Sequence, residues 1–293
     1  ACGARQFACG AVVLACGGFE GNAEMVVRYI GAKGRYLRPV ARGGYYNKGE
    51  GIAMALAIGA APSGDFAEYH TQPIDPRSPG TEPIVMIYPY GVLLNIEGKR
   101  FLDEAPGPID ASYEDTTRTI AAQTKGMAFC ILDDKINTID HWQRCVRSTE
   151  PPESAPEIAT LARKLGFDGV AAEHTIAEYN RACRGGTFNP YVLDGLATDG
   201  LTPAKSNYAV PLDKPPYRAY PIISSIVFTF GGLKTDVSAR VVNTQGEAIP
   251  GLYAAGETQG LYYGTYTGAT SVLKGLVFGR IAGKDAAGLA KAR

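Results

Sequence analysis

The sequence predicts an α/β protein that is interrupted by an inserted α+β unit, and three observations support this fold class. A continuous apolar run ends in paired glycines near the N-terminus, at 11–18. A strand, a glycine-rich loop and a helical pattern follow one another at 249–287. Between them prolines are frequent and short strand patterns alternate with helical ones, which is typical of α+β structure. We therefore expect 1–66 and 222–293 to form one domain around an inserted domain at 67–221.

The first strand is predicted at 11–15, where the apolar run suits a strand that is covered on both faces. Cys16, Gly17 and Gly18 end this strand at a point where a ligand can approach the backbone, and Asn22 begins a helical stretch. A strand followed by two glycines is a weak signal when taken alone.

A helix is predicted at 52–58, after a turn at 47–51. Its residues are small and apolar on all sides, which indicates a buried helix, and Gly59 is placed to end it. In the inserted unit we expect a strand at 91–95 and helices at 158–165 and 176–183. An antiparallel ribbon with a turn at 244–246 then leads into the last part of the chain.

The C-terminal pattern contains the most informative residues. A short buried strand is predicted at 252–255, and Gly256 and Glu257 follow where it ends. Ligands of open α/β sheets bind just beyond the carboxyl ends of strands. Three glycines without side chains come next, and a helix is predicted at 269–287, with Thr270 or Ser271 as its cap.

A helix N-terminus offers unpaired N–H groups and a partial positive charge, which suits an anionic ligand. The pattern therefore predicts a cradle for a polyhydroxylated, anion-forming cofactor. The plainer interpretation, one more strand, loop and helix of a mixed sheet, has about equal weight from spacing alone.

Composition excludes several classes of function. The chain has 29 basic and 29 acidic residues and no net charge, which argues against electrostatic binding of nucleic acid. No apolar run approaches the roughly 18 residues that a membrane span needs, and the N-terminus lacks a signal-peptide pattern. The six cysteines form no CxxC pair and the three histidines do not cluster with them, so we predict no metal site. Scattered reduced thiols favour a cytoplasmic protein.

The C-terminal stretch resembles the flavin motif of the fumarate reductase/succinate dehydrogenase flavoprotein family, with the tricarballylate dehydrogenase and 3-ketosteroid dehydrogenase branches nearest. The matching text is IPGLYAAGE followed by GATSVLKGLVFGRIAG. The resemblance implies FAD as cofactor, a partial FAD-binding Rossmann-like domain at 1–66 and 222–293, and a flavoprotein capping domain at 67–221. It implies that Glu257, next to Gly256, binds the ribitol of FAD. It also implies that Ser271 and Val272 face the pyrimidine edge of the isoalloxazine ring. Gly268 is a further cofactor-binding candidate, because its backbone can lie close against a flat group.

Other segments resemble further cofactor-binding parts of the family. Cys16, Gly17 and Gly18 match the end of a strand that contacts the nucleotide half of FAD, although a threonine or alanine is usual at Cys16. Gly49 and Glu50 match a helix start near the flavin, an interpretation about level with that of a plain buried helix. Gly232 matches one of two paired glycines beside the flavin.

The inserted unit resembles the family's capping domain, and 91–104 is close to its hairpin. We expect Lys99 and Arg100 to be solvated residues of that hairpin.

The family's N-terminal GxGxxG loop is absent from this sequence. The resemblance covers nearly all of this chain but only about the C-terminal three-fifths of a family member. Because the pyrophosphate normally sits on that missing helix N-terminus, the chain alone should bind FAD poorly. The chain is then a fragment, is completed by an N-terminal segment or a second chain, or derives from a decayed gene.

The family's chemistry forms or reduces an alkene next to a carbonyl or carboxylate, by hydride transfer at flavin N5 together with proton transfer. His70 falls where the family has a substrate-facing histidine, with a structural histidine as an equal alternative. Tyr266 resembles a tyrosine that hydrogen-bonds a substrate carbonyl, and its alternative is aromatic packing around the ring.

The cations with which fumarate reductases hold their substrate are replaced: Val227 and Phe228 stand for a histidine pair, and Tyr266 for an arginine. We therefore expect a small-molecule substrate that is not a dicarboxylate. An aromatic pocket is expected instead, formed by Tyr262, Tyr263, Tyr266, Phe228 and Phe230, with Tyr88 and Tyr90 as further candidates. The competing function is a non-catalytic remnant that acts as a binding module. The electron partner is not predicted.

Overall fold

The computed structural model describes residues 5–291, so Cys2 lies outside the described residues. The chain divides into two compact units. The first unit contains Ala1–Arg35, Gly43–His70 and Ile226–Arg293, and the second contains Tyr36–Arg42 and Thr71–Ser225. Mixed helix and sheet structure is present in both, in agreement with the predicted fold class. No helix within 5–291 is both long enough and apolar enough to cross a membrane.

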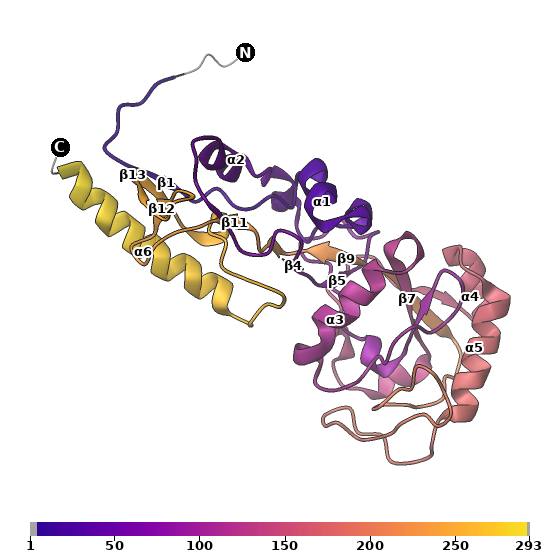
Figure 1. The fold of residues 1–293 in the computed structure, drawn as a ribbon. Coiled ribbons are helices and arrows are strands. Elements are labelled where there is room, and N and C mark those ends of the chain that lie inside the picture. Colours follow the sequence, from indigo (N-terminus) through magenta and orange to yellow (C-terminus); the bar gives the residue numbers. More distant parts are fainter. Residues whose placement is uncertain (1–4, 292–293) are drawn as a thin grey trace. The chain divides into compact units, whose positions relative to one another are not determined.

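The first unit is built on a three-stranded sheet in the order β1-β13-β12. β1 (Val12–Leu14) runs parallel to β13 (Ala248–Ala254), and β12 (Arg240–Val242) pairs with β13 in the antiparallel direction. The turn between β12 and β13 contains Gly246 at a φ of +85°, within the predicted turn. The long C-terminal helix α6 (Thr270–Lys291) packs along this sheet (Figure 1).

Shorter elements surround that sheet. Helix α1 (Ala23–Ile30) begins after Asn22, whose Oδ1 accepts a hydrogen bond of 3.2 Å from the N–H of Met25, as an N-cap residue does. Helix α2 is Glu50–Ala57, and a short 3₁₀ turn, η7, is Gly256–Thr258. Two antiparallel ribbons complete the unit: β3 (Pro62–Ser63) with β11 (Gly232–Leu233), and β4 (Tyr69–His70) with β10 (Phe228–Thr229).

The second unit is organised around the long strand β9 (Tyr217–Ile226), whose last residue already belongs to the first unit. The main strand order is β2-β9-β7-β6, and β5 and β8 also pair with β9. The remaining bounds are β2 Arg38–Pro39, β5 Pro73–Ile74, β6 Val92–Asn95, β7 Met127–Leu132, β8 Glu153–Ala155, α3 Ile109–Ala121, α4 Ile158–Leu165 and α5 Gly169–Ala182.

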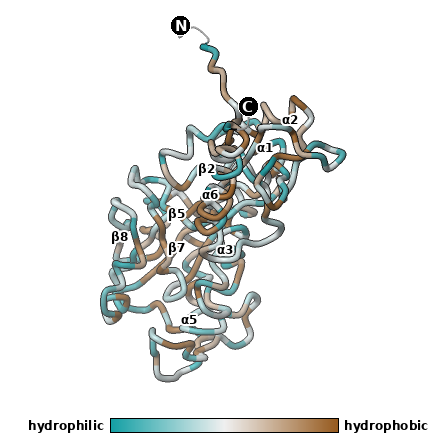
Figure 2. Tube along the Cα trace, turned by 90° about the vertical axis from the view of Figure 1, so that its left-hand side faces the viewer, coloured by the Kyte–Doolittle hydropathy of each residue, from teal (hydrophilic) through white to brown (hydrophobic). Residues whose placement is uncertain are grey.

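This second sheet is buried on both faces. Phe129 and Ile131 of β7 pack with α4 and α5 in one core cluster, whereas Cys130 and Leu132 pack in another cluster with Ile120 of α3. Alternate residues of a strand point to opposite faces, so a strand covered on both sides is apolar throughout. β7 has this composition, and its tube is brown along its length in Figure 2.

Two expectations about burial in the first unit were wrong. β1 was expected to be covered on both faces, but Val12 is 44% exposed and Val13 is 38% exposed. The reason is that β1 pairs only with β13 among the described residues, which leaves it at the edge of the sheet. The helix predicted at 52–58 was expected to be buried all round, but Met54 and Ile58 are exposed. An apolar sequence alone does not specify whether a neighbouring element is present to cover it.

Three expectations in the second unit also differ. The turn at 95–99 forms, with Gly98 at a φ of +69°, but β6 pairs with β7 rather than within a hairpin. Arg100 is buried rather than solvated, because its guanidinium forms an ion pair with the buried Glu104 at 2.6 Å. The helix predicted at 176–183 begins earlier, at Gly169, where the Oδ1 of Asp168 accepts a hydrogen bond from the N–H of Ala171.

Candidate cofactor site

The parallel pairing of β1 with β13 brings two distant segments together at the carboxyl ends of both strands. The hydroxyl of Thr258 donates to the carbonyl of Gly17 at 3.0 Å and accepts from the N–H of Cys16 at 3.1 Å. The turn after β1 is thereby fixed against η7, which follows β13. This is the edge of the sheet at which open α/β proteins bind their ligands.

Glu257 lies in η7 and is held by donors from two other segments. Its Oε1 accepts hydrogen bonds from the N–H of Thr229 at 2.7 Å and from the Thr229 hydroxyl at 3.1 Å. The N–H of Gly18 also bonds to this carboxylate. Burial raises the pKa of Glu257, while these hydrogen bonds lower it.

Glycines allow the close approach around this acid. A Cβ on Gly18 would lie 2.2 Å from the Glu257 Oε1 and 2.1 Å from the Thr229 hydroxyl, so any other residue there would displace both groups. A Cβ on Gly232 would lie 2.5 Å from the carbonyl oxygen of Thr258. The close packing of both segments against the residues around Glu257 therefore depends on bare backbone at Gly18 and Gly232.

The remaining predicted residues before Glu257 lie around the same turn. Gly49 is the residue before α2, at a φ of +77°, and its N–H donates to the carbonyl of Gly18 at 2.9 Å. Glu50 is exposed in the first turn of α2, and Cys16 is exposed at the end of β1. Gly256 has a φ of +66°, with open space where a side chain would be.

The glycine loop and the start of α6 form the other side of the candidate site. Open space lies where a Cβ on Gly268 would be, and the Val272 side chain is exposed. The Tyr266 hydroxyl accepts a hydrogen bond of 3.3 Å from the Ser271 N–H and lies 3.0 Å from the Ser271 Oγ. The structure therefore places the Tyr266 phenol at the helix start, against the amide that the sequence assigned to the flavin ring.

An aromatic cluster adjoins this loop. The His70 ring lies 4.4 Å from that of Tyr266 and 5.2 Å from that of Phe228, measured between centroids. Tyr262 lies 5.6 Å from both Phe228 and Tyr266 and 5.5 Å from Phe230. Four of the aromatic residues expected to line a pocket, Phe228, Phe230, Tyr262 and Tyr266, are thus in contact with one another in the first unit, together with His70. Tyr263 is exposed. Tyr88 and Tyr90 belong to the second unit, where Tyr88 is buried in the core.

Sequence reasoning missed two ionisable residues near Glu257. Lys274 is buried in α6, where its Nζ donates to the carbonyl of Gln259 at 2.8 Å and lies 4.7 Å from the centroid of the Tyr262 ring. Burial lowers the pKa of Lys274 to about 8, and the Glu257 charge acts in the opposite direction. Glu20 is buried beside Glu257. The sequence contains a signal for each of them. Lys274 is a lysine within an apolar helical pattern, and Glu20 is an acid two residues after the paired glycines.

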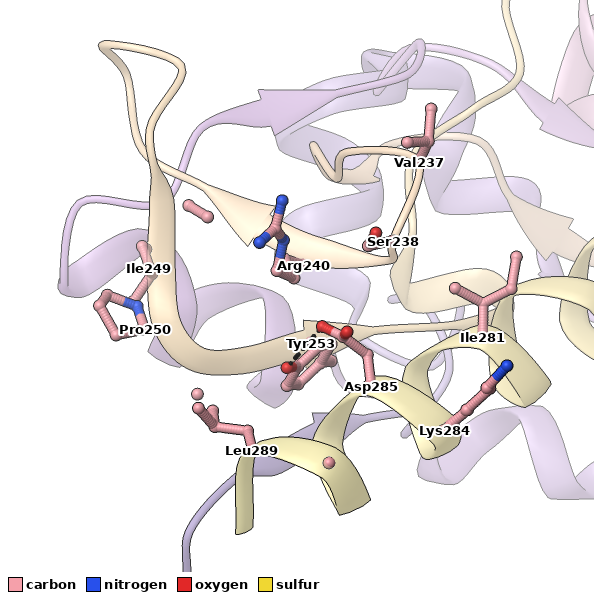
Figure 3. Close-up of a pocket in the computed structure, with 13 residues that line it drawn as sticks. Val237, Ser238, Arg240, Ile249, Pro250, Tyr253, Ile281, Lys284, Asp285 and Leu289 are labelled. Carbon is pink, nitrogen blue, oxygen red and sulfur yellow. Dashed lines mark hydrogen bonds between the residues drawn. The ribbon is translucent and has the colours of Figure 1, made fainter. Parts of the chain in front are cut away.

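A cavity of about 880 Å³ lies elsewhere in the first unit. It is lined by the start of β13 and the C-terminal half of α6, where the Tyr253 hydroxyl donates to Asp285 at 2.9 Å (Figure 3). None of the predicted cofactor residues lines it, and it is at the opposite end of β13 from Glu257. Among the described residues no group of three or more His, Cys, Asp or Glu side chains is arranged to hold a metal ion.

The residues present fit the sugar-like and ring portions of a nucleotide cofactor. A carboxylate accepts hydrogen bonds from hydroxyl groups, a helix start offers N–H groups to an electron-rich ring edge, and glycines let a flat group approach the backbone. A strand-end acid fixed against a Gly-Gly turn, with a helix start after it, defines a nucleotide-cofactor-binding protein of the α/β class.

Comparison with known proteins specifies that class further. A family model described as an FAD binding domain matches residues 3–273, which is most of the chain. The protein belongs to this FAD-binding family, that of the fumarate reductase/succinate dehydrogenase flavoproteins, as the resemblance predicted. FAD is therefore the cofactor that the match indicates.

Relatives and solved structures agree. The NADH:acrylate oxidoreductase of Vibrio harveyi is 31% identical over 95% of this chain and 27% of its own length. The open conformation of a flavocytochrome c3 fumarate reductase superposes with a TM-score of 0.74 at 25% identity, over 96% of this chain and 46% of that one. The 3-ketosteroid-Δ4-(5α)-dehydrogenase of Rhodococcus jostii RHA1, in complex with 4-androstene-3,17-dione, superposes with a TM-score of 0.62 at 25% identity, over 94% of this chain and 52% of that one. The chain thus spans between about a quarter and half of these proteins.

Proposed function

We propose that this chain is part of an FAD-dependent oxidoreductase that forms or reduces a C=C bond next to a carbonyl or carboxylate. The observation that supports this most directly is Glu257, which is fixed at the end of β13 beside the Gly17–Gly18 turn. The similar proteins include an acrylate oxidoreductase, a fumarate reductase and a ketosteroid dehydrogenase, whose names share this reaction type.

Bound FAD supplies hydride transfer, and this chain's residues supply binding and orientation. Glu257 accepts hydrogen bonds from the ribityl hydroxyls, and Gly17, Gly18 and Gly232 keep the adjoining backbone bare. The first turn of α6, with Ser271 and Val272, would hold the electron-rich edge of the ring, because a helix N-terminus carries a partial positive charge.

The substrate in this proposal is a small molecule that is not a dicarboxylate. Tyr266 donates its phenolic hydrogen to a substrate carbonyl, after exchanging its present partner, Ser271. His70 lies against the Tyr266 ring and orients it for that exchange. Phe228 and Tyr262 exclude water from the same place. Tyr266→Phe in the complete flavoprotein should lower kcat at least about tenfold (roughly 1.4 kcal/mol), and an unchanged kcat would refute this role.

A further segment completes the FAD site in this proposal. The exposed valines of β1 and the exposed apolar residues of α6 lie where another strand and its helix can add to the sheet, since β1 has only β13 as a described neighbour. We propose that an N-terminal segment with a phosphate-binding loop, or a second chain, provides them. We also propose a cytoplasmic location, from the expectation that the cysteines stay reduced.

Titration with FAD of the chain, together with the segment that completes the site in this proposal, tests the proposal. Quenching of flavin fluorescence on addition of the protein measures the affinity. Glu257→Gln should weaken binding at least about tenfold, because hydrogen bonds to a charged acceptor are each worth about 1.5–3 kcal/mol. Glu247→Gln, at an exposed glutamate in the turn after β12, is the matched control and should leave the affinity unchanged. Two outcomes would favour the alternative, a non-catalytic remnant that acts as a binding module. One is an equal FAD affinity of Glu257→Gln and Glu247→Gln. The other is that the chain does not bind FAD even after the proposed further segment has been added.

A further inference from the structure

A second glutamate lies against Glu257 in the first unit. Glu20 is 5% exposed, and its carboxyl group is hydrogen-bonded to that of Glu257. The Oε1 of Glu20 accepts a hydrogen bond from the side-chain amide of Asn47. Its Oε2 is buried and accepts no hydrogen bond from any N–H or O–H group among residues 5–291. An oxygen in this position is poorly satisfied as part of a carboxylate but well placed to carry a proton.

Two carboxyl groups in contact and away from water cannot both be ionised, so the pair retains one proton. The surrounding donors decide which glutamate carries it. Glu257 receives hydrogen bonds from Thr229 and from the N–H of Gly18, and it also feels the positive charge of Lys274. Within the described part of the chain, Glu20 receives hydrogen bonds only from the neutral amide of Asn47 and from its own backbone N–H, and no cation acts on it as Lys274 acts on Glu257. The negative charge is therefore more stable on Glu257, and the proton on Glu20.

We propose that Glu20 is a positioning residue, a neutral acid that donates a hydrogen bond to the Glu257 carboxylate and holds it as the acceptor for the ribityl hydroxyls of FAD. The protonation of Glu20 is a property of this chain by itself. Only the consequence for FAD rests on the function proposed above.

The electrostatics of the pair agree with this assignment. Burial, and after it the negative charge of Glu257, raises the pKa of Glu20 to about 9, while the hydrogen bond from Asn47 lowers it. Two further charged groups lie on neighbouring segments. Lys274 is directed at the carbonyl of Gln259, and the Nζ of Lys48 donates to the carbonyl of Gly21 at 2.9 Å.

Stability should fall with pH because of this proton. A glutamate has an ordinary pKa near 4.5, so above that pH the unfolded chain loses the proton that folded Glu20 retains. The folded state then binds more protons than the unfolded state, and the unfolding equilibrium constant rises up to about tenfold per pH unit between about pH 5 and pH 9. Below the ordinary pKa, both states are protonated and the dependence disappears.

Glu20→Gln tests the assignment, because its amide also donates a hydrogen bond but cannot ionise. Urea unfolding of the chain from pH 5 to pH 7, below the pKa of about 8 of Lys274, should show the tenfold-per-unit dependence in the unmodified chain and in the control Glu24→Gln, which alters an exposed glutamate of α1. In Glu20→Gln this component should be absent, and the variant should be the more stable one at pH 7. Parallel pH profiles for Glu20→Gln and the unmodified chain would overturn the proposal.

Infrared spectroscopy observes the proton directly. With ¹³C-labelled glutamate, the chain at pH 7 should show the carbonyl stretch of one neutral carboxylic acid, and Glu20→Gln should lose it. Its absence from the unmodified chain, or its persistence in Glu20→Gln, would overturn the assignment even if Glu20→Gln folds poorly.

FAD titration separates the two parts of the argument. Glu20→Gln should bind FAD within about threefold of the unmodified chain, whereas Glu20→Ala and Glu257→Gln should each weaken binding at least about tenfold. If Glu20→Gln binds as weakly as Glu20→Ala, Glu20 does not act by donating a hydrogen bond. If no variant binds FAD but the infrared and pH results hold, the proposed function fails and the acid pair remains.

Discussion

The two units of this protein differ in how completely each covers its own sheet. In the second unit α4 and α5 cover one face of β7 and α3 contributes to the cluster on the other. In the first unit α6 packs on the sheet, yet the valines of β1 and the apolar residues of α6 near its N-terminus remain exposed. Large exposed apolar surfaces mark places where another polypeptide or a ligand binds. The unit that carries the candidate site is thus the one whose core is incomplete.

Buried carboxylates show the same difference. Glu104 in the second unit is paired with the buried Arg100, and its Oε1 also accepts from the N–H of Leu93 at 3.0 Å. Glu257 in the first unit is held by N–H and O–H donors and shares its surroundings with a second acid, Glu20. A carboxylate neutralised by a buried arginine stabilises the fold. The two neighbouring acids of the first unit instead have raised pKa values, and shifts of this kind are frequent in functional sites.

Removing Arg100 should produce the largest effect on stability. Arg100→Ala leaves Glu104 buried without its counter-ion, which typically costs about 3–5 kcal/mol. Urea unfolding, followed by far-ultraviolet circular dichroism, should show the loss in the transition of the second unit. The control is Lys99→Ala at the neighbouring exposed position, which should change the free energy of unfolding by less than about 0.5 kcal/mol.

FAD affinity sharpens this first test. If Arg100 stabilises only its own unit, Arg100→Ala should reduce FAD binding only in proportion to the fraction of protein that is unfolded. Under conditions where the variant is fully folded, its FAD affinity should equal that of the unmodified protein. A variant that is fully folded but has lost affinity would show that the buried pair in the second unit acts on the cofactor, and the contrast between the two carboxylates would fail.

The sequence predicted the parts of the fold that depend on local pattern. α4 occupies the range predicted for it, and the Asn22 cap and the turn before β13 also formed as expected. Burial was predicted less well, since Val13 and Met54 are exposed although their segments are apolar. Whether an apolar face is covered depends on elements distant in the chain or outside it, and a local pattern does not contain that information.

Motif and spacing indicated the acid at the strand end but not the residues that hold it. Glu257 followed from its place after a strand, whereas Thr229 and Glu20 meet it only through the tertiary fold. The same is true of Tyr266, whose bond to Ser271 could not be inferred from the glycine loop. The cofactor-binding and catalytic roles of these residues remain predictions.

Truncating the same residue type on one helix of each unit should give the clearest comparison, and the smallest effect is expected at the exposed leucine. Leu161 of α4 is 0% exposed, and Leu276 of α6 is 68% exposed. Leu161→Ala should cost about 2–5 kcal/mol, because it removes buried apolar contacts and leaves a cavity. Leu276→Ala in this chain should change the free energy of unfolding by less than about 0.5 kcal/mol, since alanine is at least as good a helix former and little contact is lost.

The comparison becomes decisive in a protein to which the proposed further segment has been added. If an added strand and helix cover α6, Leu276 becomes buried, and Leu276→Ala in the complete flavoprotein should cost about 2 kcal/mol or more, as at Leu161. Hydrogen exchange at the amides of β1 should slow in the same protein, because a new neighbouring strand would pair with them. The opposite outcome is an effect of Leu276→Ala that stays below about 0.5 kcal/mol, together with unchanged hydrogen exchange in β1. It would mean that this face of α6 remains open to solvent. The first unit would then have to bind its ligand with the three-stranded sheet β1-β13-β12 alone.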